Sequence, residues 1–242
     1  MLDPFERGKA WFLFTKLEKD FIDTTSYVAF EAAHSSVWSE RFGELLTRTG
    51  DLVDSFFRLM IDSKSLDAET SVENLRAKIL TEQKKNSSWF PKIDDFRIAF
   101  EPVFHLSSVE VEADYGLTYY GKLHPFNCFD KQSPSWWEPY NKVKHEIFEQ
   151  IEKKATLENA INALASLFVL NILHKESQKY LVWYTDIISG KYLPKSSLHD
   201  LLSLSYVGVP KNVGSITART LLFVHVFRAN TDPRAKIKKS PF

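Results

Sequence analysis

The chain has 242 residues and a mass of 28.0 kDa, which is long enough to bury a substantial core without disulfides or a structural metal. Hydrophobic residues make up 44% and charged residues 26%, with 8 Gly and 10 Pro, which excludes a disordered, collagenous or low-complexity chain. The 31 basic and 31 acidic side chains cancel, which argues against a protein that coats nucleic acid by net charge alone.

The single cysteine suits a reducing compartment, and the hydropathy of the chain argues against a membrane span. Cys128 is the single cysteine, so an internal disulfide framework is excluded. The longest apolar run, 163–173, contains polar residues and is shorter than the roughly 20 residues that span a bilayer. The first residues include acids and show no small-residue cleavage site after an apolar stretch. We therefore expect a cytoplasmic protein with no membrane partner.

The first 90 residues predict three helices. Asp3 has the character of an N-cap before a proline, which predicts a helix over 4–19. The segment 21–33 lacks helical spacing and is expected to be an extended connector. Over 37–61 apolar residues recur every three or four positions, which predicts a buried amphipathic helix, and a shorter helix is expected over 72–84.

The region 96–123 changes period and predicts a small β-hairpin. Apolar and acidic residues alternate before a turn at Tyr115 and Gly116: Val109, Glu110, Val111, Glu112, Ala113 and Asp114. The three acidic residues look like paired carboxylates, but alternation places them on the solvent face of a strand. We therefore interpret them as structural rather than catalytic.

Two further helices are predicted between residues 133 and 188. The first, 133–153, begins with Ser135 and Glu138 at the spacing of a capping box. The second, 156–188, begins at Thr156, a good N-cap residue. The joint between them is too short for anything but an adjacent pair, which we expect to be antiparallel.

The last fifth of the chain is more basic and less regular. The stretch 216–227 is rich in β-branched and aromatic residues, and its periodicity leaves strand and helix both open. From residue 190 onward there are nine basic and two acidic side chains. This asymmetry leaves two interpretations, a basic binding face or a solvated tail, and we favour the tail.

Common catalytic and metal-binding motifs are missing. The sequence lacks a phosphate loop, a dinucleotide-binding glycine fingerprint, an HExxH pair and a GxSxG elbow. The seven histidines include no pair at the helical spacing of metal ligands, and we interpret His124 with Cys128 as incidental. We expect neither a metal nor a cofactor.

Asn141 and His145 are the most informative polar pair. Four residues of helix turn through about 400°, so the two side chains lie on one face and can contact one ligand. An imidazole moves protons near neutral pH, an amide can orient it, and Lys142 and Lys144 add positive charge. The set suits phosphodiester chemistry or anion binding. The alternative is structural, with His145 hydrogen-bonded to Asn159 or Asn162 on the next helix.

The stretch SPSWWEPYNKVKHEIFEQIEKKATLENAINALASLFVL, Ser133 to Leu170, resembles uncharacterised prokaryotic proteins with a WWxxYNxxKH helix followed by an ATLxNxxNALAxLF helix. The resemblance extends weakly to the helix over 37–61 and to the PKI segment at Pro91. Such proteins are similar to the HEPN superfamily of helical bundles, many of which are metal-independent ribonucleases that act as dimers.

The resemblance implies roles for individual residues. His145 matches the catalytic histidine and Asn141 the polar residue after the motif's arginine, whose own position is taken by Tyr140. A phenol cannot give the bidentate cationic contact of an arginine, and the helical period turns Tyr140 inward. Lys144 is then expected to hold phosphate, with Lys142 as a second nucleic-acid contact.

We therefore expect a mainly α protein, a HEPN-like helical bundle over 1–190 with a β-hairpin insertion near 96–123, followed by a basic extension over 191–242. Three functions are open. The first is metal-independent ribonuclease activity of a homodimer, in defence or RNA processing. The second is a non-catalytic module that binds a nucleotide, RNA or a protein. The third is a structural assembly held by exposed aromatic residues such as Trp137 and Phe148.

Overall fold

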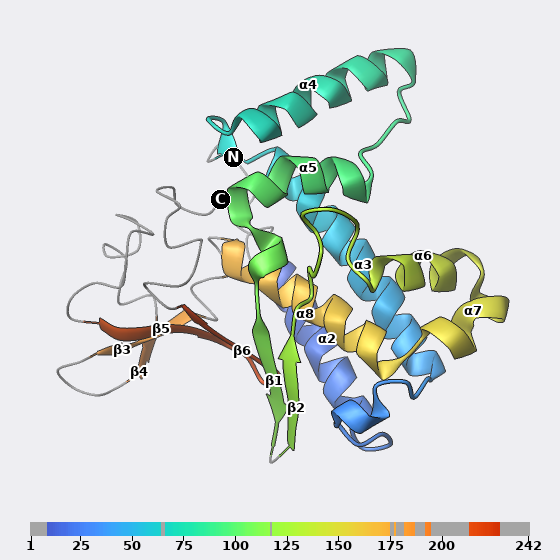
Figure 1. Ribbon diagram of the computed structural model, residues 1–242, viewed down its shortest axis with the longest axis vertical. Helices are drawn as coiled ribbons and strands as arrows, with labels where there is room; N and C mark the ends of the chain where they lie inside the picture. The colour runs from blue at the N-terminus through green and yellow to red at the C-terminus, as the bar shows by residue number, and fades with distance from the viewer. Residues whose placement is uncertain are drawn as a thin grey trace.

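The computed structural model describes residues 9–63, 66–116, 118–174, 177, 182–186, 192–194 and 213–227. Within these ranges the protein is mainly helical, as the sequence predicts. Its α-helices are α2 (Lys9–Thr24), α3 (Glu40–Ile61), α4 (Thr70–Lys85), α5 (Ile93–Phe104), α6 (Trp137–His145), α7 (Ile147–Lys154) and α8 (Leu157–Leu173), with short 3-10 turns at η1 (Ala32–His34) and η3 (Leu106–Ser108). Figure 1 shows α2, α3 and α8 side by side, α4 and α5 across one end, and α6 and α7 on one flank.

Helix α8 forms the centre of the core. Almost every residue from Ala160 to Leu173 is buried, which is typical of a helix that is apolar on all sides. As predicted, Thr156 caps it, because its hydroxyl accepts a hydrogen bond from the Asn159 N–H at 3.3 Å. A β-bridge between Trp38 and Thr156 places the starts of α3 and α8 together, so the two helices run in the same direction.

A six-stranded antiparallel sheet packs beside the helices. Its order is β2-β1-β6-β5-β3-β4, with β1 (Val111–Tyr115), β2 (Thr118–Leu123), β3 (Val182–Asp186), β4 (Tyr192–Pro194), β5 (Val213–Arg219) and β6 (Phe223–Phe227). The predicted hairpin is confirmed as β1 and β2. Val109, Val111 and Ala113 are buried, and Gly116 adopts the left-handed φ of 63° that the turn requires.

The sheet is larger than the sequence predicts. The helix expected over 156–188 ends at Leu173, and residues 182–186 form β3, so the second part of that prediction is wrong. The segment Val-Trp-Tyr-Thr consists of good strand formers, and pairing with β5 decides its structure. The stretch 216–227, left open above, is strand. The described strands of the 191–242 extension belong to this sheet, whereas its basic end, 228–242, lies outside the described residues.

The helices of the first 104 residues follow the predictions with two differences. The helix over 37–61 is confirmed as α3 and the helix over 72–84 as α4. The start of the first predicted helix lies outside the described residues, and α2 continues to Thr24 into the expected connector, since Phe21 is fully buried against Phe30 and Phe42. Residues 93–104 form α5, so the prediction of a β insertion is wrong over 96–104.

The predicted helix over 133–153 is broken at Glu146. This residue has φ −131° and ψ 44°, which separates α6 from α7 without a proline or a glycine. Lys142 and Gln150 both donate to the Glu146 carboxylate, at 3.2 Å and 3.1 Å. The predicted capping box does not form, because Trp136 occupies the N-cap position and makes no side-chain cap. The break makes His145 the last residue of α6.

Candidate functional site

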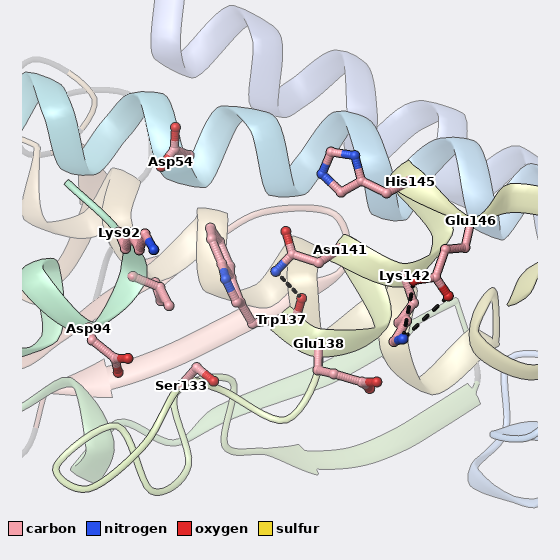
Figure 2. Close-up of a pocket in the computed structure, with 11 residues that line it drawn as sticks. Asp54, Lys92, Asp94, Ser133, Trp137, Glu138, Asn141, Lys142, His145 and Glu146 are labelled. Carbon is pink, nitrogen blue, oxygen red and sulfur yellow. Dashed lines mark hydrogen bonds and ion pairs between the residues drawn. The ribbon is translucent and has the colours of Figure 1, made fainter. Parts of the chain in front are cut away.

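A cleft of about 540 Å³ lies between α3, the start of α5 and α6, and we call it the α5–α6 cleft. Its volume falls in the range of roughly 300–1,000 Å³ that is usual for small-ligand sites. Figure 2 shows the side chains around it. The lining residues are Asp54, Lys92, Ile93, Asp94, Ser133, Trp137, Glu138, Asn141, Lys142, His145 and Glu146.

The structure brings Asn141 and His145 together, as the four-residue spacing predicts. Both side chains project from α6 into the α5–α6 cleft (Figure 2). The Asn141 amide nitrogen donates to the Trp137 carbonyl oxygen at 3.1 Å, which fixes the amide and leaves its oxygen facing α3. A ligand in the cleft can therefore reach an oriented amide oxygen and an imidazole at once.

His145 is exposed at the rim of the cleft and is not used in packing. Asn159 donates to the Lys154 carbonyl and Asn162 to the Glu158 carbonyl, each at 2.9 Å, so the structural alternative for His145 is not formed. Within the described part of the chain, His145 has no hydrogen-bond or ion-pair partner. Both ring nitrogens are free to contact a ligand.

Every acidic side chain of the α5–α6 cleft is neutralised by a basic neighbour. The ion pairs are Asp54–Arg58 at 2.7 Å, Asp94–Arg97 at 3.3 Å, Glu138–Lys154 at 3.1 Å and Glu146–Lys142 at 3.2 Å. Lys92 also lines the cleft and has no ion-pair partner among the described residues. The positive charge that remains to attract a ligand is therefore that of Lys92, and of His145 when it is protonated.

The local fold explains the position of Lys92. It follows the buried Pro91 and immediately precedes α5, and its backbone N–H donates to the Asp95 carboxylate at 2.8 Å. The first turn of α5, at Ile93 and Asp94, lines the cleft. The N-terminal turn of α5 therefore adds the positive end of its helix dipole to the cleft that Lys92 lines.

Lys144 is not brought into the α5–α6 cleft. Its ammonium group donates to the Asp51 carboxylate at 2.6 Å and to the Tyr140 phenol oxygen at 2.9 Å. The Tyr140 hydroxyl in turn donates to Asp51 at 2.7 Å. The hydrogen bonds to Asp51 and Tyr140 raise the pKa of Lys144 above its ordinary value, and burial raises the pKa of Tyr140 to about 12. Lys142 does line the cleft, but Glu146 binds it.

Of the two aromatic residues predicted to be exposed, only Phe148 is. Its side chain is 98% exposed on α7, whereas Trp137 is 8% exposed, so the prediction for Trp137 is wrong. The Trp137 ring packs against Trp136 and Tyr140, with ring centroids 5.4 Å and 5.0 Å away. Trp137 therefore forms a wall of the cleft within its own chain.

Sequence reasoning missed the cleft residues outside α6. Asp54 comes from α3, Lys92 and Asp94 from the start of α5, and Ser133 from the segment before α6. Their approach depends on tertiary packing, which periodicity cannot predict. One signal was present, since the PKI segment that contains Lys92 is part of the resemblance described above.

The described residues form neither a metal cluster nor a membrane-spanning helix. In the described ranges, no three His, Cys, Asp or Glu side chains gather closely enough to hold a metal ion. Nor does any helix there combine the length and apolarity needed to cross a membrane. No protein-family model, no curated protein and no solved structure matches this chain, so the HEPN resemblance stays a prediction.

Proposed function

We propose that the α5–α6 cleft binds RNA and that the protein cleaves it without a metal ion, with His145 as the proton-transfer group. One observation carries the proposal. The cleft exposes three polar side chains that take part in no ion pair, those of Lys92, Asn141 and His145. Its acidic side chains are all paired with basic neighbours. Such a site attracts a phosphate and supplies an imidazole that can act as a general acid or a general base.

The chemistry follows from these groups. A base removes the proton of the ribose 2′-hydroxyl, the 2′-oxygen attacks the adjacent phosphorus, and the bond from phosphorus to the 5′-oxygen breaks. An acid protonates the departing 5′-oxygen, which leaves a 2′,3′-cyclic phosphate and a 5′-hydroxyl end. His145 takes one of these two roles, and a homodimer would bring a second His145 for the other. Lys92 holds the phosphate, and Asn141 orients the imidazole or the substrate.

Lys92 supplies the positive charge that the HEPN motif takes from its arginine. Tyr140 stands where the motif has arginine, and its hydroxyl is bound to Asp51. Lys92 reaches the same cleft from α5 and supplies a cation there. We assign Lys144 a positioning role through Tyr140 and Asp51, because its ammonium group is bound outside the cleft.

A second function, binding of RNA or a nucleotide without cleavage, is favoured by the same observation on Tyr140. The motif position that would carry an arginine holds Tyr140. The described cleft therefore offers one unpaired lysine per chain to stabilise the negative charge on the phosphate in the transition state. Binding requires only the cleft, the cation and the oriented amide. The two functions differ in whether the bound phosphodiester is cut.

Incubation with a mixed-sequence RNA in EDTA separates them. Cleavage by the parent protein that is lost in His145→Ala, with unchanged helical circular dichroism, supports the ribonuclease. The matched control is His124→Ala, which removes an exposed histidine that does not line the cleft. Cleavage that persists in His145→Ala contradicts the mechanism. If RNA raises the melting temperature but stays intact, the binding function is the better account.

The third expectation, a structural assembly, loses part of its basis because Trp137 is buried within the chain. Phe148 is the exposed aromatic that still fits it. Sedimentation of Phe148→Ala beside the parent protein tests this surface, since an unchanged association state excludes Phe148 from any interface between copies.

A further inference from the structure

An exposed aromatic ring lies beside the α5–α6 cleft. Phe90 is 53% exposed and stands two residues before Lys92. The guanidinium carbon of Arg58 lies 4.7 Å from the centre of the Phe90 ring. Arg58 is bound to Asp54, which lines the cleft. The Phe90 ring therefore contacts Arg58, which binds the cleft residue Asp54, and the backbone leads from Phe90 to the cleft residue Lys92.

The Arg58 guanidinium is held in a fixed orientation. Its Nε donates to the Asp54 carboxylate at 2.9 Å, and a terminal nitrogen lies 2.7 Å from the same oxygen. A planar cation fixed in this way supports the ring from one side. Because more than half of the Phe90 side chain remains exposed, an apolar planar group can still stack against it.

Other exposed aromatic residues do not combine these features. Tyr27 is 90% exposed in the loop after α2, and Phe148 is 98% exposed on α7. Among the described residues, neither of these two rings has a cation over its face. Within the described residues, Phe90 is the exposed aromatic residue that has an arginine over its ring and stands two positions before the unpaired Lys92.

We infer that Phe90, supported by Arg58, stacks on an unpaired nucleobase, so that the RNA bound in the α5–α6 cleft is single-stranded. The inference rests on the proposed function, because the cleft supplies the phosphate contact. An aromatic face and a cation side by side are the pair of contacts by which proteins hold single strands. Bases inside an A-form duplex are stacked on each other and leave no face for Phe90.

The test measures binding of a labelled single-stranded 2′-O-methyl oligoribonucleotide, which the proposed reaction cannot cut. Phe90→Leu removes the ring but keeps an apolar side chain, and we expect about tenfold weaker binding. Phe90→Trp restores a stacking surface and should bind like the parent protein. Tyr27→Leu is the matched control for loss of an exposed ring. The same sequence as a duplex should bind more weakly and be insensitive to Phe90→Leu.

Salt dependence distinguishes stacking from an indirect effect on Arg58. A lost stacking contact leaves the slope of log affinity against log salt unchanged, whereas a lost phosphate contact reduces it. Equal affinity of the parent and Phe90→Leu, or a reduced slope in Phe90→Leu, overturns the inference and leaves the proposed function standing. If the folded parent protein binds no RNA at low salt, the proposed function fails and the inference falls with it.

Discussion

The ring of Tyr140 lies directly against the backbone of Gly50. A Cβ atom at Gly50 would stand 2.3 Å from Cδ2 and 2.5 Å from Cε2 of that ring. Glycine at this position therefore allows α3 and α6 to approach closely, and the Tyr140 hydroxyl binds Asp51, the next residue of α3. Tyr140 is thus a packing residue between two helices that form the cleft.

We expect Gly50→Ala to lower the free energy of unfolding by about 1–3 kcal/mol. The added methyl group overlaps the Tyr140 ring, and this cost exceeds the gain in helix propensity of about 0.5–1 kcal/mol. Urea denaturation measures the difference. Gly43→Ala is the control, because its Cβ would lie 3.3 Å from that of Ala155 and should cost less. Equal effects of the two substitutions would contradict the packing described for Tyr140.

Tyr140 should also make stability fall at alkaline pH. Burial raises the pKa of Tyr140 from 10.0 to about 12, so the folded chain keeps a proton that the unfolded chain loses. The resulting stabilisation is complete below pH 10 and is lost as the pH rises through about 12. Tyr140→Phe should show a shallower decline of unfolding free energy between pH 10 and 12, measured by urea denaturation.

Tyr119→Phe is the control for this effect, because its side chain is 58% exposed on β2. It should follow the parent protein through the alkaline range. A decline in Tyr140→Phe as steep as that of the parent would exclude Tyr140 as its source. Burial likewise raises the pKa of Tyr120 to about 12, so part of the decline should persist in Tyr140→Phe.

A buried carboxylate joins α2 to the β5–β6 turn and should give stability a second pH dependence. Glu18 is 3% exposed and accepts hydrogen bonds from the Thr220 hydroxyl and from the Leu222 N–H, the latter at 3.0 Å. Burial raises its pKa above 4.5. The folded chain therefore binds the proton more tightly, and the associated stability is present below pH 4.5 and lost as the pH rises through the raised value.

Glu18→Gln removes the charge but keeps a hydrogen-bond acceptor, so its unfolding free energy should fall less than that of the parent above pH 4.5. Chemical denaturation between pH 4.5 and 8 checks this. Glu149→Gln, an exposed change on α7, should leave the pH profile unaltered. If Glu18→Gln follows the parent curve, the carboxylate is not the source of the dependence.

Local patterns predicted the helices better than the strands that pair over long distances. The three-and-four spacing over 37–61 reports a helix with one buried face, and α3 has that face. The spacing of aromatic residues after Leu173 was compatible with a helix, but pairing of β3 with β5, far along the chain, outweighed it. The break at Glu146 has no proline or glycine, so no local residue signals it.

The same distinction applies to the cleft. Asn141 and His145 share a helix, so their spacing alone places them together. The sequence cannot show that Asp51 and Tyr140 bind Lys144. Asp51 belongs to α3 and stands 93 residues before Lys144 in the chain. Lys92 belongs to the cleft only because α5 begins beside α6.

Lys92 should contribute one phosphate contact to RNA binding. We expect Lys92→Ala to weaken binding of a single-stranded 2′-O-methyl probe and to reduce the slope of log affinity against log salt by about 0.7, the value for one contact to a single strand. Fluorescence anisotropy at several salt concentrations measures both quantities. Lys84→Ala is the matched control, because Lys84 is an exposed lysine near the end of α4 and does not line the cleft. The assignment of the phosphate to Lys92 fails if the two variants bind alike. It also fails if Lys92→Ala binds more weakly with an unchanged slope, because the lost interaction would then not be ionic.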